Sequence, residues 1–157
     1  MEIEIDWSDP IELEDGAKDL LIYKCPTLGD IPDSPGIYIF ARRHGDNITP
    51  LYIGQAQRLR RRIEQQLNNT RLMKGIEVAE SGARVLLIGQ MALKPGQRVP
   101  RVLDVAESAI MEYALAEGHS ILNKQGTKQR VHTIQSRGNM WSRQVVSLNL
   151  HIRRGNV

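Results

Sequence analysis

Two tyrosines lie in short apolar segments that have the alternation of neighbouring β-strands. Tyr38 belongs to the run GIYIF and Tyr52 to the run PLYIG, and a polar segment at residues 45–47 separates them. Apolar residues of period two on both sides of a Gly/Asp/Asn segment predict a β-hairpin, with strands over 36–43 and 49–54. In an antiparallel pair the two phenols could face each other across the ladder, although ordinary core tyrosines would give the same pattern.

An arginine-rich helix is predicted directly after the hairpin, over residues 56–68. Its apolar positions follow at i, i+4 and i+8 and form a narrow buried stripe: Leu59, Ile63 and Leu67. With 100° of rotation per residue, Arg60 and Arg62 each lie about 80° around the helix axis from this stripe. Both side chains can therefore lean along the edge of the sheet. Arg58 and Arg61 lie on the far side of the helix.

A second helix is predicted over residues 102–117, and an acid interrupts its apolar face. Glu107 lies four residues after Leu103, and apolar residues follow it on the same face. A carboxylate in such a position is unfavourable unless it has a partner. Glu112 lies about 140° around the helix from Glu107, nearer the solvent side. We therefore prefer Glu107 as the functional acid, with Glu112 as the alternative.

Three further strands are predicted from apolar patterning. Residues 83–91 form the most apolar run and are expected to be central in the sheet, whereas residues 2–6 and 144–152 alternate. The chain therefore mixes strands and helices in one domain-sized sequence of 157 residues.

A phenol, a guanidinium and a carboxylate together suit the hydrolysis of a phosphodiester. Arginine offers a planar fork for phosphate oxygens, and a carboxylate is a ligand for a hard divalent ion such as Mg²⁺. A phenol near such an ion can lose its proton below its ordinary pKa of about 10 and act as a general base.

Other catalytic patterns are missing from the sequence. It has no glycine-rich phosphate loop, no HExxH motif and no Cys/His spacing typical of a metal site. The four histidines show no pairing pattern, and the single cysteine, Cys25, cannot form an intrachain disulfide.

The order and spacing of these glycine and polar residues resemble the sequence pattern of the GIY-YIG nuclease superfamily, over roughly Ile31 to Lys124. Two tripeptides are literal matches, Gly36-Ile37-Tyr38 and Tyr52-Ile53-Gly54. The pattern G-x4-L-x2-R follows at Gly54, Leu59 and Arg62. The family's helical acid, followed by two residues and an apolar pair, matches Glu107-Ser-Ala-Ile-Met, and its closing asparagine matches Asn123.

This resemblance implies an α+β fold with a small three-stranded antiparallel sheet flanked by helices. It also implies a DNA endonuclease that requires Mg²⁺ or Mn²⁺. Tyr38 and Tyr52 would line one catalytic surface, and one of them would help to deprotonate the attacking water. Arg62 would stabilise the pentacovalent phosphate and the leaving oxygen. Glu107 would bind the single metal ion, and Asn123 would position groups of the site by hydrogen bonding.

The chain departs from the family pattern at three places. Gln55 follows the YIG glycine, where some members have Lys, Ser or Thr. Tyr38 and Tyr52 are 14 residues apart, which is longer than in many members. The separation from Glu107 to Asn123 is 16 residues, and from Glu112 it would be 11.

Charge is distributed unevenly along the chain. Residues 1–35 hold ten acidic and two basic side chains (net −8), whereas residues 36–157 hold eight acidic and nineteen basic ones (net +11). A basic body is expected of a polyanion binder, with solvated surface charge as the alternative. We predict an acidic N-terminal arm over 1–35, a nuclease domain over 36–124 and a basic C-terminal extension over 125–157 packed on the same domain.

Six cations are predicted to contact the DNA backbone, where they would position the duplex without reading its sequence: Arg58, Arg60, Arg61, Lys124, Lys128 and Arg130. The alternative function is a non-catalytic nucleic-acid-binding domain that keeps the same fold. A homodimer and a complex with a partner protein are both compatible with the sequence.

The sequence predicts no association with a membrane. No apolar run approaches the roughly 18 residues that span a bilayer. The acidic N-terminus lacks the apolar region of a signal peptide, so a cytoplasmic location is expected.

Overall fold

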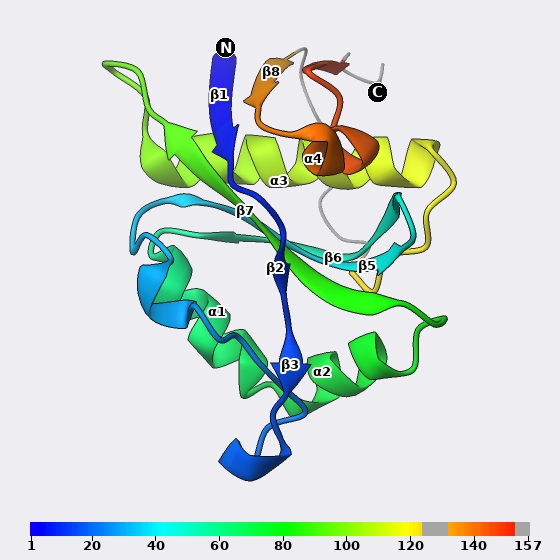
Figure 1. The fold of residues 1–157 in the computed structure, drawn as a ribbon. Helices are drawn as coiled ribbons and strands as arrows, with labels where there is room; N and C mark the ends of the chain where they lie inside the picture. The colour runs from blue at the N-terminus through cyan, green and yellow to red at the C-terminus, as the bar shows by residue number, and fades with distance from the viewer. Residues whose placement is uncertain (124–131, 153–157) are drawn as a thin grey trace.

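The predicted hairpin around the two tyrosines forms one edge of a larger, mixed and curled sheet (Figure 1). A computed structural model describes residues 1–123 and 132–152. The hairpin strands are β5 (Gly36–His44) and β6 (Asn47–Ala56), paired antiparallel. Strand β5 runs one residue beyond its predicted end, and β6 runs two residues beyond its prediction at each end.

The sheet continues from β5 through segments that are distant in sequence. Its strand order is β6-β5-β7-β1-β8-β9. The short strand β2 (Ile11–Glu12) also pairs with β7, at Val85 and Leu86. The additional strands are β7 (Ala83–Ala92), β1 (Glu2–Trp7), β8 (His132–Arg137) and β9 (Asn149–Ile152). The β1–β8 pair is parallel and the others are antiparallel. The sheet therefore has seven strands instead of the expected three.

The sheet is larger than expected because β1 pairs on both of its edges, with β7 and with β8. Its alternation buries Ile3, Ile5 and Trp7 on one face, as a half-buried strand requires. A small second sheet joins β3 (Glu14–Asp15) to β4 (Tyr23–Lys24). Short 3₁₀ turns at Ala17–Asp19 and Leu28–Asp30 complete the N-terminal segment.

Helices cover both faces of the sheet. The helices α1 (Leu59–Leu67) and α2 (Thr70–Glu77) lie below the sheet in Figure 1, whereas α3 (Val99–Ala116) and α4 (Met140–Val145) lie above it. The predicted strand over 144–152 is wrong in its first part. Asn139 accepts hydrogen bonds from the amides of Trp141 and Ser142, which begins α4 as a capped helix instead.

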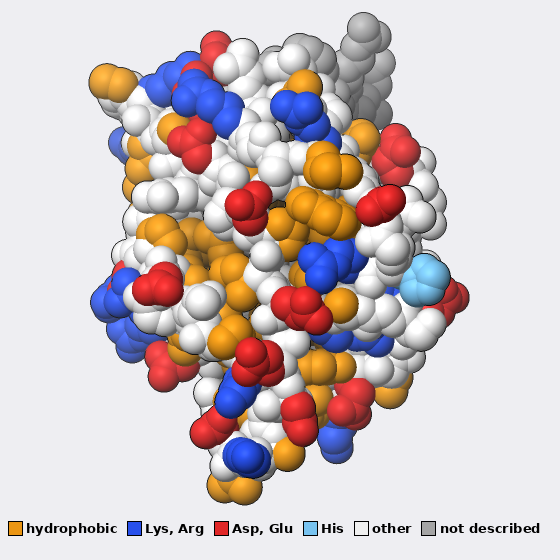
Figure 2. All heavy atoms as spheres, viewed as in Figure 1, with side chains coloured by type: hydrophobic (Ala, Val, Ile, Leu, Met, Phe, Trp, Pro, Cys, Tyr) orange, Lys and Arg blue, Asp and Glu red, His pale blue; other side chains and the backbone are white. Residues whose placement is uncertain are grey.

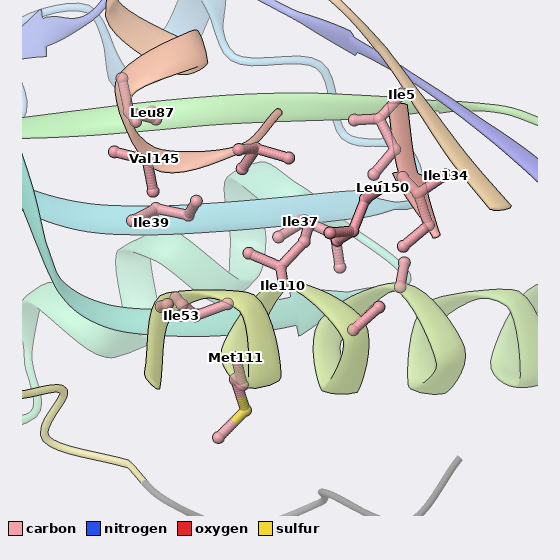
Figure 3. Close-up of a cluster of buried hydrophobic side chains, with 14 of the residues drawn as sticks. Ile5, Ile37, Ile39, Ile53, Leu87, Ile110, Met111, Ile134, Val145 and Leu150 are labelled. Atoms are coloured by element: carbon pink, nitrogen blue, oxygen red, sulfur yellow. The ribbon is translucent and has the colours of Figure 1, made fainter. Parts of the chain in front are cut away.

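Alternation along β5 and β6 sorts side chains between two cores. Ile37, Ile39 and Ile53 pack toward α3 in one cluster (Figure 3). Tyr38 and Phe40 point the other way, into the cluster formed with α1 and α2. The phenols predicted to be functional therefore lie on the α1 side of the sheet.

Acids of the N-terminal segment pair with cations of the remaining chain. Glu2 contacts Lys94 at 3.0 Å, Glu4 contacts Arg137 at 2.7 Å, and Glu12 contacts Arg43 at 3.1 Å. On the face drawn in Figure 2, acidic and basic side chains are interspersed and form no extended patch of one sign.

No helix in the described ranges is both long enough and apolar enough to cross a lipid bilayer.

Candidate functional site

The two tyrosine rings stack diagonally across the hairpin. The register pairs Tyr38 with Gly54 and Tyr52 with Phe40, so the phenols are offset instead of directly opposite. Their ring centroids are 6.1 Å apart with an interplanar angle of 26°. Tyr38 is buried and Tyr52 is half-buried, which leaves one phenol accessible from solvent.

The glycine of the second tripeptide makes room for the first tyrosine. A Cβ at Gly54 would lie 2.3 Å from Cζ of Tyr38. The glycine of the first tripeptide is confined in a similar way, because a Cβ at Gly36 would lie 2.3 Å from the carbonyl oxygen of Gly89. Close packing, and not a left-handed backbone, requires both glycines.

Gln66 on α1 holds both phenols. Its Nε2 donates to Tyr38 Oη at 2.7 Å and lies 3.3 Å from Tyr52 Oη, and its side chain is 5% exposed. Asn69, which caps α2 through the amide of Leu72, donates to Gln66 Oε1. Since the amide donates to both phenol oxygens, each phenol keeps its own proton for another acceptor.

Burial raises the pKa of Tyr38 to about 12. The Gln66 hydrogen bond lowers this pKa, the neighbouring Tyr52 raises it, and the Arg62 guanidinium lowers it. The environment therefore favours the neutral phenol, and cationic and hydrogen-bonding neighbours only partly oppose this.

Glu107 lies on α3, on the opposite face of the sheet from the phenols, and contacts the edge strand β6 at Gln55. It is half-buried and accepts a hydrogen bond from Gln55 Nε2 at 2.9 Å. Burial raises the pKa of the Glu107 carboxyl, Gln55 lowers it, Asp104 raises it and Arg62 lowers it. The Arg62 guanidinium is therefore close enough to the carboxyl of Glu107 and to the phenol of Tyr38 to lower the pKa of both.

The structure distinguishes Glu107 from Glu112. Among the described residues, no hydrogen bond or ion pair joins Glu112 to the tyrosines, Arg62 or Gln55. The acid on the apolar face of α3, Glu107, is the one that contacts Gln55.

Asn123 anchors the edge of β6. Its Oδ1 accepts from the Ile53 amide at 3.2 Å, and its Nδ2 donates to the Ile53 carbonyl. The amide of Leu122 donates to the carbonyl of Leu51 at 2.8 Å. Asn123 thus positions the strand that carries Tyr52 and Gln55, and it acts on the backbone.

The arginines of α1, and Arg58 at its N-cap, have different partners. Arg58 forms an ion pair with Asp33 at 2.6 Å, and the same carboxylate accepts from the amide of Arg61. Arg60 donates from Nε to the carbonyl of Ile31 at 2.8 Å. All four arginines, including Arg61 and Arg62, are exposed. Lys124, Lys128 and Arg130 lie outside the described residues.

A shallow depression of about 300 Å³ adjoins the edge of β6 beside α1. It is lined by Gln55, Ala56, Gln57, Arg58, Arg61, Arg62 and Gln65. Three guanidinium groups around an open depression can bind an anion such as a phosphate.

The residues present fit a hard divalent cation. No group of three or more His, Cys, Asp or Glu side chains is placed to ligate a metal within the described ranges. Mg²⁺, however, keeps several waters and is usually bound by one or two carboxylates. The two carboxylates that share the Gln55 amide, Glu107 and Asp104, supply such a donor set.

Sequence reasoning did not select Gln66 or Asp104. Gln66 is four residues after Arg62 and beside Leu67 on the buried stripe, and a polar residue there requires partners. Asp104 precedes Glu107 by three residues and so shares its helix face. Both spacings were available in the sequence as signals.

Comparison of the chain with protein-family models, with curated proteins and with solved structures finds no match.

Proposed function

We propose that this chain is a divalent-metal-dependent DNA endonuclease of the GIY-YIG type. The observation that carries the proposal is that Tyr38 and Tyr52 stack across the hairpin and that the Arg62 guanidinium lowers the pKa of both Tyr38 and Glu107, although these residues come from both faces of the sheet. The resemblance was assigned from the order of these residues in the sequence, and their proximity in space supports it independently.

The arrangement of elements also supports the proposal. The strands β6-β5-β7 with α1 and α3 provide the three-stranded antiparallel unit that the resemblance implies, and the other strands extend it. The arginine-lined depression beside Gln55 would give the phosphate backbone of DNA a cationic surface that includes Arg62.

In the proposed reaction, Arg62 binds the scissile phosphate with its planar guanidinium and stabilises the negative charge that develops on it. A phenol accepts a proton from the attacking water. Tyr52 is the more accessible phenol, whereas Tyr38 is buried with its pKa raised to about 12. Gln66 holds both phenol oxygens in place throughout.

A divalent ion held by Glu107 would supply Lewis-acid stabilisation of the phosphate oxygens. Asn123 keeps β6, and with it Tyr52, in register by its two bonds to Ile53. The chain's own contribution is thus to orient the phosphate and to accept a proton.

The test is nicking of supercoiled plasmid with Mg²⁺ or Mn²⁺, with EDTA as the control. We expect metal-dependent nicking by the wild type and a loss of at least 100-fold in Arg62→Ala and Glu107→Gln, as for removal of one charge-stabilising group. Tyr38→Phe and Tyr52→Phe should each reduce the rate, and the larger reduction identifies the proton acceptor.

Glu112→Gln is the matched control, because it removes the same charge from the same helix. It should nick at the wild-type rate. Salt-sensitive binding of DNA without cleavage by the wild type would instead indicate the non-catalytic binding domain.

A further inference from the structure

The hydrogen bonds to the two phenols continue through Gln66 to the start of helix α2. Asn69 is the N-cap of α2, and its Oδ1 accepts from the backbone amide of Leu72 at 3.1 Å. Its Nδ2 donates to Gln66 Oε1 at 3.3 Å. Gln66 Nε2 in turn donates to Tyr38 Oη at 2.7 Å and to Tyr52 Oη at 3.3 Å. One continuous set of hydrogen bonds thus joins the first turn of a helix to both candidate catalytic groups.

The direction of every bond in this set follows from its first member. The backbone N–H of Leu72 can only donate, so it faces the oxygen of the Asn69 amide and not the nitrogen. The Asn69 nitrogen consequently faces Gln66 and requires an acceptor there, which is Gln66 Oε1. With its oxygen engaged, Gln66 presents its nitrogen to the phenols.

The orientation of the Gln66 amide decides which form of a phenol it stabilises. An amide turned by 180° fills the same space, and a phenol hydroxyl can donate to an amide oxygen as well as accept from an amide nitrogen. N–H donors stabilise the charged phenolate, whereas a carbonyl oxygen stabilises the neutral phenol. A tyrosine that takes a proton from water therefore needs the orientation in which the amide nitrogen faces it.

We propose that Asn69 is a positioning residue, which fixes the orientation of the Gln66 amide so that both phenol oxygens face N–H donors. The catalytic meaning of this orientation rests on the proposed nuclease function, whereas the orientation itself does not. Asn69 thus has two roles, as the cap of α2 and as the group that orients the site.

The substitution Asn69→Asp separates these two roles. Aspartate caps a helix about as well as asparagine does, so α2 should still begin at the same residue. A carboxylate accepts hydrogen bonds and has none to donate, however, so it would face Gln66 Oε1 with an oxygen. The Gln66 amide should then turn, donate to the carboxylate and present its oxygen to the phenols.

Asn68→Asp is the matched control. It adds the same charge at the neighbouring residue, and Asn68 is exposed and donates to the carbonyl of Glu64. A change that is specific to Asn69→Asp therefore reports the contact with Gln66 and not the added charge.

The first measurement is the nuclear Overhauser effect between the side-chain amide protons of Gln66 and the ring protons of Tyr38 and Tyr52, in the full chain without DNA. We expect cross peaks to both rings in the wild type and in Asn68→Asp. They should be lost in Asn69→Asp, with an unchanged circular dichroism spectrum. Cross peaks of wild-type strength in Asn69→Asp would overturn the inference, as would their loss in Asn68→Asp.

The second measurement is plasmid nicking with Mg²⁺ by the same preparations. Asn69→Asp should nick about tenfold more slowly, because the phenolate loses its N–H donors, and Asn68→Asp should nick at the wild-type rate. A wild-type rate in Asn69→Asp despite lost cross peaks would overturn the catalytic meaning of the orientation.

The two measurements together separate this inference from the proposed function. If the wild type nicks DNA while Asn69→Asp keeps its cross peaks, the positioning role is wrong and the nuclease stands. If the wild type nicks no substrate while the cross peaks change as expected, the orientation by Asn69 stands and the nuclease is wrong.

Discussion

The phenol of Tyr38 is a candidate catalytic group, and it lies in an environment that opposes its ionisation. The ring lies against the backbone of Gly54, on the side of the sheet that α1 covers. A single side-chain amide, that of Gln66, donates a hydrogen bond to its oxygen. A phenol held in this way is well oriented but poorly ionised at neutral pH. Tyr52, stacked beside it and half-buried, has the same amide partner and better access to water.

This environment predicts an alkaline loss of stability. Burial raises the pKa of Tyr38 to about 12 in the folded protein, against about 10 in the unfolded chain. Folding therefore favours the neutral phenol, and the resulting stabilisation is fully present below pH 10 and is lost as pH rises from 10 to about 12. Two units correspond to roughly 3 kcal/mol in the free energy of unfolding.

Urea denaturation of the wild type and Tyr38→Phe at pH 9, 10, 11 and 12 measures this effect. The variant cannot titrate at position 38, so its free energy of unfolding should fall less steeply over this interval. Parallel curves for the two proteins would contradict a raised pKa of Tyr38.

At the scale of elements, the edge strand β6 determines the site. Tyr52 and Gln55 belong to it, α1 and the phenols lie on one side, and Glu107 of α3 reaches it from the other. An edge strand has one row of unpaired backbone groups. Here the chain at Leu122 and Asn123 supplies partners for part of that row.

We expect Asn123→Ala to loosen β6 locally. The amide and carbonyl of Ile53 would both lose their partner, which costs about 1–2 kcal/mol in the free energy of unfolding. Amide hydrogen exchange should become faster at Ile53.

The matched control is Asn68→Ala, which removes one exposed bond from Asn68 to the Glu64 carbonyl and should leave exchange at Ile53 unchanged. If Asn123→Ala and its control show equal exchange at Ile53, Asn123 does not anchor the strand.

At the scale of the whole molecule, the N-terminal segment is part of the sheet. Strand β1 lies between β7 and β8 and buries its apolar face in the core with α3. Its acids pair with cations from later parts of the chain, so the opposite charges of the two segments meet in the folded protein.

Ile5→Ala should therefore destabilise the whole fold. Ile5 is fully buried between two paired strands, and removing such a side chain costs about 2–5 kcal/mol in the free energy of unfolding. Ile11→Ala is the control, because Ile11 is only half-buried on the two-residue strand β2. Thermal and urea denaturation would measure both variants, and an equal loss in the two would contradict a core role for β1.

The hairpin, both long helices and the apolar strand over 83–91 were predictable because each has a clear local period. Apolar alternation identified β5 and β6, and the glycine after Tyr52-Ile53 is explained by contact with Tyr38. The preference for Glu107 over Glu112 also came from local pattern, since an acid on an apolar helix face needs a partner. These features depend on neighbours within one element.

The position of β1 inside the sheet, the capped helix α4 and the shared Gln55 amide were decided by tertiary structure. Each depends on groups that are distant in sequence: β1 pairs with residues 89–92 and 133–137, and Gln55 reaches helix residues 104 and 107. Local periodicity carries no information about such pairings, because many arrangements of the same elements would bury the same apolar faces. The sequence by itself thus determined which side chains are available for chemistry, and only the packing of α1 and α3 around the edge of β6 brought them together.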